Sequence, residues 1–230
     1  MNYRKLETPQ GVTLMPASAV QASVVWLHGL GADGNDFVPL IPELQLPDTL
    51  AVRFVFPHAP VRPVTINNGM RMRAWYDVVG FGANRVEDEQ GITASSAFVR
   101  DLVAREIASG IASTRVVIAG FSQGGAIALH AALRYPEPLA GVLGLSTYLP
   151  CRGRLSAEAS AANRRIPILM CHGTYDPVLP FDLGTASRDA LIAAGYAVTW
   201  KAYPMQHQVC GPEVTDIATW LHDRFSLPRD

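Results

Sequence analysis

The sequence has few charged side chains and almost no net charge. Charged residues make up 17% of the 230 positions, and 19 basic against 20 acidic residues give a formal net charge of −1. A protein that is drawn to nucleic acid or to an anionic membrane surface needs an excess of basic residues. We therefore expect no nucleic-acid partner, and a neutral small molecule is the expected substrate.

Cysteines and long apolar runs are also scarce. Cys151, Cys171 and Cys210 are odd in number and far apart, which fits neither a disulfide framework nor the paired ligands of a zinc site. No stretch approaches the roughly 18 uncharged apolar residues of a membrane span, and residues 1–12 lack the apolar run of a secretory signal. We expect a cytoplasmic protein with reduced thiols, no stable membrane insertion, and no metal or cofactor.

Apolar residues are abundant and are grouped in short runs that alternate with helical segments. The apolar runs predict strands at residues 24–27, 52–56, 116–119, 139–145, 166–170 and 198–203. Helices are predicted between them, at residues 36–44, 93–107, 123–135, 182–194 and 213–225. Unbroken apolar strands that alternate with helices are typical of parallel sheets covered on both faces. The sequence therefore predicts an α/β fold with a mostly parallel central sheet and helices on both faces.

The length and the absence of internal repeats indicate one domain that covers residues 1–230. Within it, residues 57–90 form a long segment without clear periodicity between a predicted strand and a predicted helix. Loops of this length are usually functional or disordered, and the bulky rings of Trp75 and Tyr76 stabilise a structure by packing. We interpret residues 57–90 as a folded excursion that shapes a binding site.

A candidate nucleophile lies where a predicted strand meets a predicted helix. Residues 120–124 read G-F-S-Q-G, which matches the G-x-S-x-G pattern centred on Ser122. In that pattern the serine sits on a strained turn at the top of the sheet, and glycines flank it because side chains there would collide with neighbouring backbone. The alternative is a glycine-rich packing turn with no chemistry, which the strand and helix context disfavours.

A serine hydroxyl needs a base, and the base needs an orienting acid. In α/β-hydrolases the three groups follow in the order serine, acid, histidine. Asp176 follows a predicted strand after Ser122, and His207 follows the last predicted strand, so both have the required order and placement. Asp182 is the rival acid, although it is better interpreted as a helix N-cap. We expect structural roles for the other histidines, His28, His58, His130, His172 and His222.

A glycine-rich loop follows the early strand at residues 24–27. Residues 28–34 read H-G-L-G-A-D-G, which would let backbone N–H groups point into a site. Acyl transfer requires two such donors, one after the nucleophile and one from an early loop, which nominates the amides of Gln123 and Leu30. The loop also matches G-x-G-x-x-G of dinucleotide folds. That alternative leaves Ser122 without a role and lacks a ribose-binding acid near position 55.

Four ordered motifs together resemble the phospholipase/carboxylesterase family of α/β-hydrolases, which includes bacterial carboxylesterases and acyl-protein thioesterases. The matching residues are 27–33, 120–125, 172–176 and 203–207, and the similarity extends over roughly residues 24–221. The resemblance implies an α/β-hydrolase fold with Ser122, Asp176 and His207 as the catalytic triad. It also implies Leu30 and Gln123 as oxyanion donors, and no metal.

The resemblance further implies a shallow acyl groove and, as in many members, a homodimer. Trp75 and Tyr76 resemble the substrate-side wall of the family, so we predict that both bind substrate; the alternative is that their rings pack in the core and hold the loop. Gln206 departs from the pattern, because many members have glycine before the histidine. A wider side chain there is expected to narrow the site or to shift the base.

The leading hypothesis is a serine carboxylesterase that hydrolyses short to medium acyl esters through an acyl-enzyme on Ser122. An acyl-protein thioesterase or a lysophospholipase would use the same triad, so an acylated protein or a lysophospholipid is an alternative partner. A catalytically silent binding protein on a hydrolase scaffold is a third hypothesis. It would be expected to lack a triad member, and none is missing from this sequence.

Overall fold

The computed structural model describes residues 3–80 and 86–226, and its centre is an eight-stranded sheet. The strands follow the order β1-β2-β4-β3-β9-β10-β11-β12 across the sheet. Their bounds are β1 Tyr3–Thr8, β2 Gly11–Pro16, β3 Ala22–Leu27, β4 Val52–Pro57, β9 Val116–Phe121, β10 Gly141–Leu145, β11 Ile168–Gly173 and β12 Val198–Tyr203. The six strands from β4 to β12 pair in parallel, and β2 joins them antiparallel through β4.

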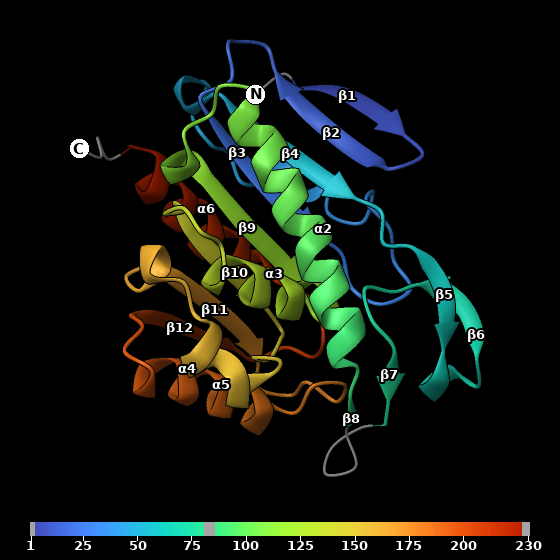
Figure 1. Ribbon diagram of the computed structural model, residues 1–230. Helices are drawn as coiled ribbons and strands as arrows, with labels where there is room; N and C mark the ends of the chain where they lie inside the picture. The colour runs from blue at the N-terminus through green and yellow to red at the C-terminus, as the bar shows by residue number, and fades with distance from the viewer. Residues whose placement is uncertain (1–2, 81–85, 227–230) are drawn as a thin grey trace.

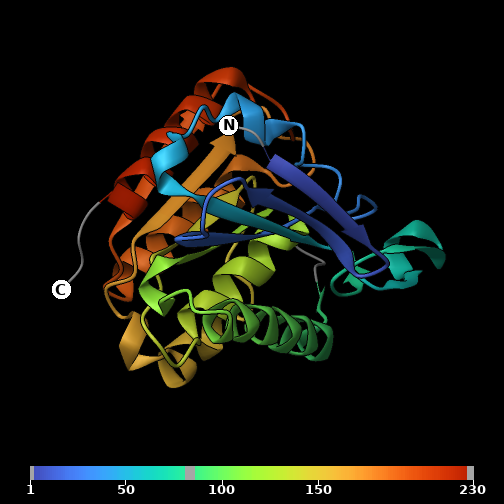
Figure 2. The ribbon, with the colours of Figure 1, turned by 90° about the horizontal axis from the view of Figure 1, so that it is seen from above.

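Helices cover both faces of this sheet (Figures 1 and 2). One layer comprises α2 (Glu89–Ala108), α3 (Gln123–Leu133), α4 (Leu155–Glu158) and α5 (Phe181–Ala193), and the other comprises α1 (Leu40–Glu43) and α6 (Gly211–Ser226). Successive residues of β3 serve opposite layers, since Val25 and Leu27 pack toward α2 and α3, and Val24 and Trp26 pack toward α1 and α6. The predicted α/β fold, with a mostly parallel sheet and helices on both faces, is confirmed.

The order of the strands reverses in the middle of the sheet. From β3 the chain moves outward to β4, and it then crosses back through α2 to β9 on the other side of β3. In open parallel sheets, ligands bind beyond the carboxyl ends of the strands at such a reversal. The loops that follow β3 and β9 therefore lie where a binding site is expected.

The long segment at residues 57–90 is folded over its described residues. It contains two small antiparallel sheets, one of β5 (Val61–Val64) with β6 (Met70–Arg73) and one of β7 (Val78–Val79) with β8 (Val86–Glu87). Figure 1 shows β5 and β6 projecting beside the main sheet, whereas β7 and β8 lie next to the start of α2. Residues 81–85 of the predicted excursion lie outside the described residues.

Local chemistry explains where the predicted helix boundaries were wrong. The helix predicted at residues 36–44 is reduced to α1, because Pro39 lacks a backbone N–H and disfavours a helical residue before it. Helix α2 begins four residues before the predicted Thr93, since the Asp88 side chain caps it by accepting a hydrogen bond from the Gly91 N–H at 2.8 Å. The hairpin of β1 and β2 was not predicted.

Among the described residues, no helix has the length and apolar content needed to cross a membrane.

We predict that Leu129→Ala lowers the free energy of unfolding by about 2–5 kcal/mol, because it leaves a cavity in a core that is close-packed. Leu129 is fully buried in α3 between the sheet and α2. The matched control is Leu6→Ala, since Leu6 is 40% exposed on the edge strand β1 and its truncation should change stability by less than about 0.5 kcal/mol. Chemical denaturation measures both; equal losses in the two variants would contradict the packing described here.

Candidate active site

Ser122 occupies a strained turn between β9 and α3. Its backbone has φ 53° and ψ −120°, a conformation that residues other than glycine rarely adopt. Two hydrogen bonds hold this turn: the Ser122 N–H donates to the Leu145 carbonyl at 2.8 Å, and the Thr147 hydroxyl donates to the Ser122 carbonyl at 2.7 Å. The turn is therefore fixed by the neighbouring strand β10 and by the loop that follows it.

The glycines on either side of Ser122 are required by close contacts of the backbone. A Cβ atom at Gly120 would lie 2.3 Å from the Gly124 carbonyl oxygen, and one at Gly124 would lie 2.5 Å from the His28 carbonyl oxygen. Both distances are shorter than real Cβ contacts. The backbone around Ser122 is therefore packed as closely as the G-x-S-x-G pattern predicts. The close approach at Gly124 places the loop after β3 against the start of α3.

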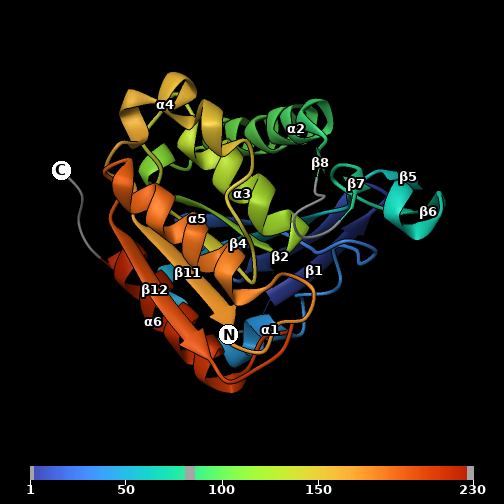
Figure 3. The same cartoon turned by 90° about the horizontal axis from the view of Figure 1, so that it is seen from below.

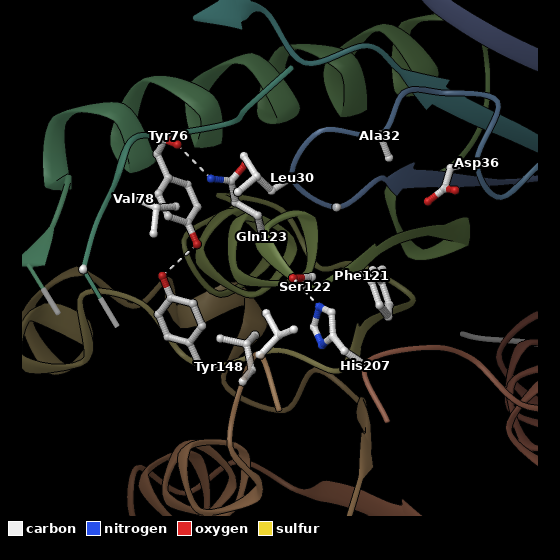
Figure 4. A pocket seen from close by; sticks show the side chains of 14 residues that line it. Leu30, Ala32, Asp36, Tyr76, Val78, Phe121, Ser122, Gln123, Tyr148 and His207 are labelled. Carbon is white, nitrogen blue, oxygen red and sulfur yellow. Dashed lines mark hydrogen bonds between the residues drawn. The ribbon is translucent and has the colours of Figure 1, made fainter. Parts of the chain in front are cut away.

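Ser122, His207 and Asp176 form a continuous chain of hydrogen bonds. His207 Nε2 lies 2.9 Å from Ser122 Oγ, and His207 Nδ1 lies 2.7 Å from Asp176 Oδ2. Figure 4 shows the Ser122 and His207 side chains directed toward one another at the rim of a cavity. The structure thereby brings together three residues that are up to 85 positions apart in the sequence.

Asp176 is oriented by the loop that follows β11. Its Oδ1 accepts hydrogen bonds from the backbone N–H groups of Val178 and Leu179 at 2.8 and 2.9 Å, which leaves Oδ2 directed at His207. The carboxylate is fully buried. Asp182, the rival acid, lies in the first turn of α5, where Pro180 and not Asp182 is the N-cap residue.

Three further histidines make hydrogen bonds that belong to the scaffold. His28 Nε2 accepts from the Ala59 N–H at 3.0 Å, and burial lowers the pKa of His28 to about 4. His58 Nδ1 accepts from the Gly34 N–H at 2.9 Å. His172 Nε2 donates to the Leu179 carbonyl at 2.9 Å, and burial lowers its pKa as well. The hydrogen bonds of these three histidines tie together the loops around Ser122.

The predicted oxyanion donors line the same cavity as Ser122. Leu30 and Gln123 both border it, and Gln123 is the first residue of α3, where a backbone N–H has no preceding turn to bond. Among residues 3–80 and 86–226, no hydrogen bond uses the Leu30 N–H, although Gly31 and Ala32 in the same loop both donate. The two residues nominated as oxyanion donors thus border the same cavity as Ser122.

The side chain of Gln123 connects the site to the excursion, which the sequence did not indicate. Its Oε1 accepts from the Trp75 N–H at 2.8 Å, and its Nε2 donates to the Tyr76 carbonyl at 2.7 Å. The Trp75 indole N–H donates to the His28 carbonyl at 2.9 Å. Hydrogen bonds between residues this far apart in the chain have no sequence pattern. The glutamine inside the serine motif was the one feature of the sequence that could have indicated them.

Trp75 and Tyr76 have different places in the structure. Trp75 is fully buried, packs in the core and does not border the cavity, so it departs from the prediction that it binds substrate. The physical reason is that both its backbone and its ring are already bonded to the loops beneath the site. Tyr76 does border the cavity, and its hydroxyl lies 2.7 Å from that of Tyr148 (Figure 4).

The cavity beside Ser122 has a volume of about 260 Å³ and a mainly apolar lining. Tyr76, Val78 and Tyr148 lie on one side of Ser122 in Figure 4, and Phe121 lies next to the His207 ring, with ring centroids 4.8 Å apart. Gln206 does not narrow the cavity, because this side chain is exposed to solvent and does not border it. The arrangement can hold an apolar group next to a hydroxyl, an imidazole and two N–H donors.

Comparison with known proteins places this site in a family. The model of the phospholipase/carboxylesterase family matches residues 10–224, which is most of the chain. An acyl-protein thioesterase 1 from Neurospora crassa is 40% identical over 227 residues, covering 94% of this chain and 93% of the relative. An acyl-protein thioesterase 1 from Yarrowia lipolytica is 36% identical over 223 residues, covering 94% and 98%.

Solved structures agree with these sequence relatives. The crystal structure of Arabidopsis thaliana SOBER1 superposes with a TM-score of 0.85 at 34% identity, covering 89% of this chain and 99% of that one. The crystal structure of Zea mays acyl-protein thioesterase 2 gives a TM-score of 0.83 at 34% identity, covering 93% and 97%. The predicted resemblance is confirmed: the chain belongs to the phospholipase/carboxylesterase family and is a hydrolase of the esterase class with the α/β-hydrolase fold.

Proposed function

We propose that the chain hydrolyses acyl esters and acyl thioesters by a double displacement in which Ser122 carries the acyl group. The observation that supports this most strongly is the hydrogen-bonded chain from Ser122 through His207 to the buried carboxylate of Asp176. Nucleophile, base and orienting acid then have the mutual distances that general-base activation requires. A silent binding protein would have no need for this arrangement.

In the acylation step, Ser122 Oγ attacks the carbonyl carbon while its proton passes to His207 Nε2, 2.9 Å away. Asp176 accepts the Nδ1 proton of His207 in a hydrogen bond, so it holds the ring in the productive tautomer and stabilises the imidazolium that forms. The carbonyl oxygen becomes an oxyanion between the N–H groups of Leu30 and Gln123. Each such donor stabilises the transition state by roughly 3 kcal/mol in comparable enzymes.

The tetrahedral intermediate collapses when the carbon–oxygen or carbon–sulfur bond to the leaving group breaks. The alcohol or thiol leaves with the proton that His207 returns, and the acyl group remains on Ser122. A water molecule then gives a proton to His207 and attacks the acyl carbon. The bond between the acyl carbon and Ser122 Oγ then breaks, Ser122 Oγ takes the proton from His207, and the acid is released with no cofactor consumed.

The acyl group is proposed to lie in the apolar cavity bordered by Tyr76, Val78, Tyr148 and Leu179. Its volume of about 260 Å³ is at the small end for a ligand site, which favours short to medium chains. Trp75 serves this wall indirectly, because its hydrogen bonds fix the backbone that carries Tyr76.

A thioester substrate is favoured by the relatives, since the fungal proteins at 36–40% identity are named acyl-protein thioesterases. An S-acylated protein is accordingly the natural substrate class that we propose, with small carboxylic esters as further substrates. A lysophospholipid would use the same chemistry. The single domain over residues 1–230, the homodimer and the cytoplasmic location stay predictions.

We predict that Ser122→Ala lowers kcat by about 10⁶ while the protein stays folded, because the change removes only the attacking oxygen. Hydrolysis of a nitrophenyl butyrate and of an S-acylated peptide, assayed side by side, measures the loss. Both activities should vanish together if one site performs both. Activity within tenfold of the wild type on either substrate would remove Ser122 from that reaction.

We predict that Asp176→Asn lowers kcat by about 10⁴ with little loss of stability. Asparagine can still accept hydrogen bonds from the Val178 and Leu179 N–H groups, but its amide presents a donor to His207 Nδ1 and so favours the wrong tautomer. Asp182→Asn is the matched control, since Asp182 lies in the exposed first turn of α5, and its activity should equal that of the wild type. Equal losses in the two variants would contradict the assignment of the acid.

We predict that Val178→Phe shortens the preferred acyl chain. Val178 borders the cavity and is 43% exposed, so a larger ring there should occupy acyl space without disturbing the core. Each methylene that no longer finds apolar contact costs about 0.8 kcal/mol, or roughly fourfold in kcat/KM. A series of nitrophenyl esters from acetate to octanoate measures the profile. An unchanged profile would place the acyl chain elsewhere.

A further inference from the structure

A second cavity adjoins the one at Ser122. It has a volume of about 420 Å³, and its lining comes from the segment around α1, from the end of β9 and from the loop between β12 and α6. Figures 2 and 3 show α1 beside the start of α6. The two cavities share three lining residues, Asp36, Phe121 and His207. A substrate bound at Ser122 can therefore extend from one cavity into the other.

The two halves of a bound substrate extend in different directions from Ser122. In Figure 4, Tyr76 of the proposed acyl cavity lies on one side of Ser122, and Asp36 and Phe121 lie on the other. His207 returns its proton to the leaving group, so the leaving group has to stay within reach of the imidazole. The second cavity borders His207 and lies on the side of Asp36 and Phe121. It is therefore placed to receive the leaving group.

Much of the lining of the second cavity is apolar. The Phe121 ring packs against two others, with its centroid 5.8 Å from that of Phe37 and 4.8 Å from that of His207. Leu40 and Val209 extend this apolar surface. A surface of this kind binds the methylene groups of a long side chain and leaves a polar end free to reach another partner.

Two carboxylates accompany the apolar groups. Asp36 and Glu43 both border the cavity, and both can be reached from solvent. Within residues 3–80 and 86–226, no lysine or arginine borders it. Partial desolvation is the largest cause that raises the pKa of Asp36, and the negative charge of Asp33 acts in the same direction. The charges around this cavity therefore favour a cation.

We propose that the second cavity receives the leaving-group half of an S-acylated protein and binds a lysine or arginine side chain that flanks the acylated cysteine. This inference rests on the function proposed for Ser122. Lysine and arginine combine an apolar stem with a cationic end, which matches a lining of apolar groups and carboxylates. An acidic side chain at the same place is repelled by Asp36 and Glu43. The two cavities thus select different halves of the substrate.

Three S-butyryl peptides that differ only in the residues flanking the acylated cysteine test this proposal. The flanking residues are lysine in the first peptide, glutamine in the second and glutamate in the third. We expect kcat/KM to be about tenfold higher for the lysine peptide than for the glutamate peptide, because attraction and repulsion both contribute, with the glutamine peptide between them. Raising the ionic strength to about 1 M should reduce this ratio, since salt screens exposed charges.

A double variant, Asp36→Asn with Glu43→Gln, removes both charges and keeps the shape of both side chains. Its ratio of kcat/KM between the lysine and glutamate peptides is expected to fall to about twofold or less. Asp101→Asn with Glu137→Gln is the matched control, because it changes the net charge equally. Asp101 and Glu137 are exposed and do not border the cavity, so the ratio should keep its wild-type value.

Equal kcat/KM for the three peptides in the wild type would overturn the proposal, and so would a wild-type ratio in the Asp36 and Glu43 double variant. Hydrolysis of nitrophenyl butyrate with no turnover of any peptide would also overturn it, because the second cavity then admits no peptide. A wild type that hydrolyses neither nitrophenyl butyrate nor the peptides would instead refute the function proposed for Ser122. The two failures are thus distinguishable.

Discussion

The strained backbone at Ser122 is the constraint on which the site depends. A non-glycine residue adopts φ 53° only where the surrounding structure holds it in that conformation. Here β10 bonds to the Ser122 N–H, and the loop after β10 bonds to the Ser122 carbonyl. The close approach of Gly124 to the His28 carbonyl then brings the loop after β3 beside the start of α3. This contact between the start of α3 and the loop after β3 positions Ser122 and both proposed N–H donors.

The other parts of the site are held by hydrogen bonds between groups of the protein. Asp176 is held by the backbone of Val178 and Leu179, while Gln123 links α3 to the Trp75 and Tyr76 backbone. The bonds from Leu179, Trp75 and Gln123 are buried, so breaking any of these leaves an unsatisfied polar group in the interior. The wall of the apolar cavity that includes Tyr76 is therefore attached to α3, the helix that begins directly after Ser122.

The sequence predicted those features that depend on local chemistry. The sheet, its two helical layers and the places of Ser122, Asp176 and His207 after strands could be predicted because apolar runs and short motifs mark them. Two features depend on contacts between distant residues and could not be predicted. Trp75 is of a residue type that often binds substrate. Its hydrogen bonds to Gln123 and His28, about 47 positions away, nevertheless hold it in the core. The edge hairpin of β1 and β2 likewise depends on its pairing with β4.

The central claim is that Ser122 is the nucleophile and is activated by His207. Labelling of the purified protein with a fluorophosphonate, followed by mass spectrometry of the modified peptide, tests it most directly. The account predicts one adduct, on the Ser122 hydroxyl, which forms far more slowly in a His207→Gln variant because the serine then lacks its base. An adduct on another residue, or labelling of Ser122 at the same rate without His207, would contradict the account.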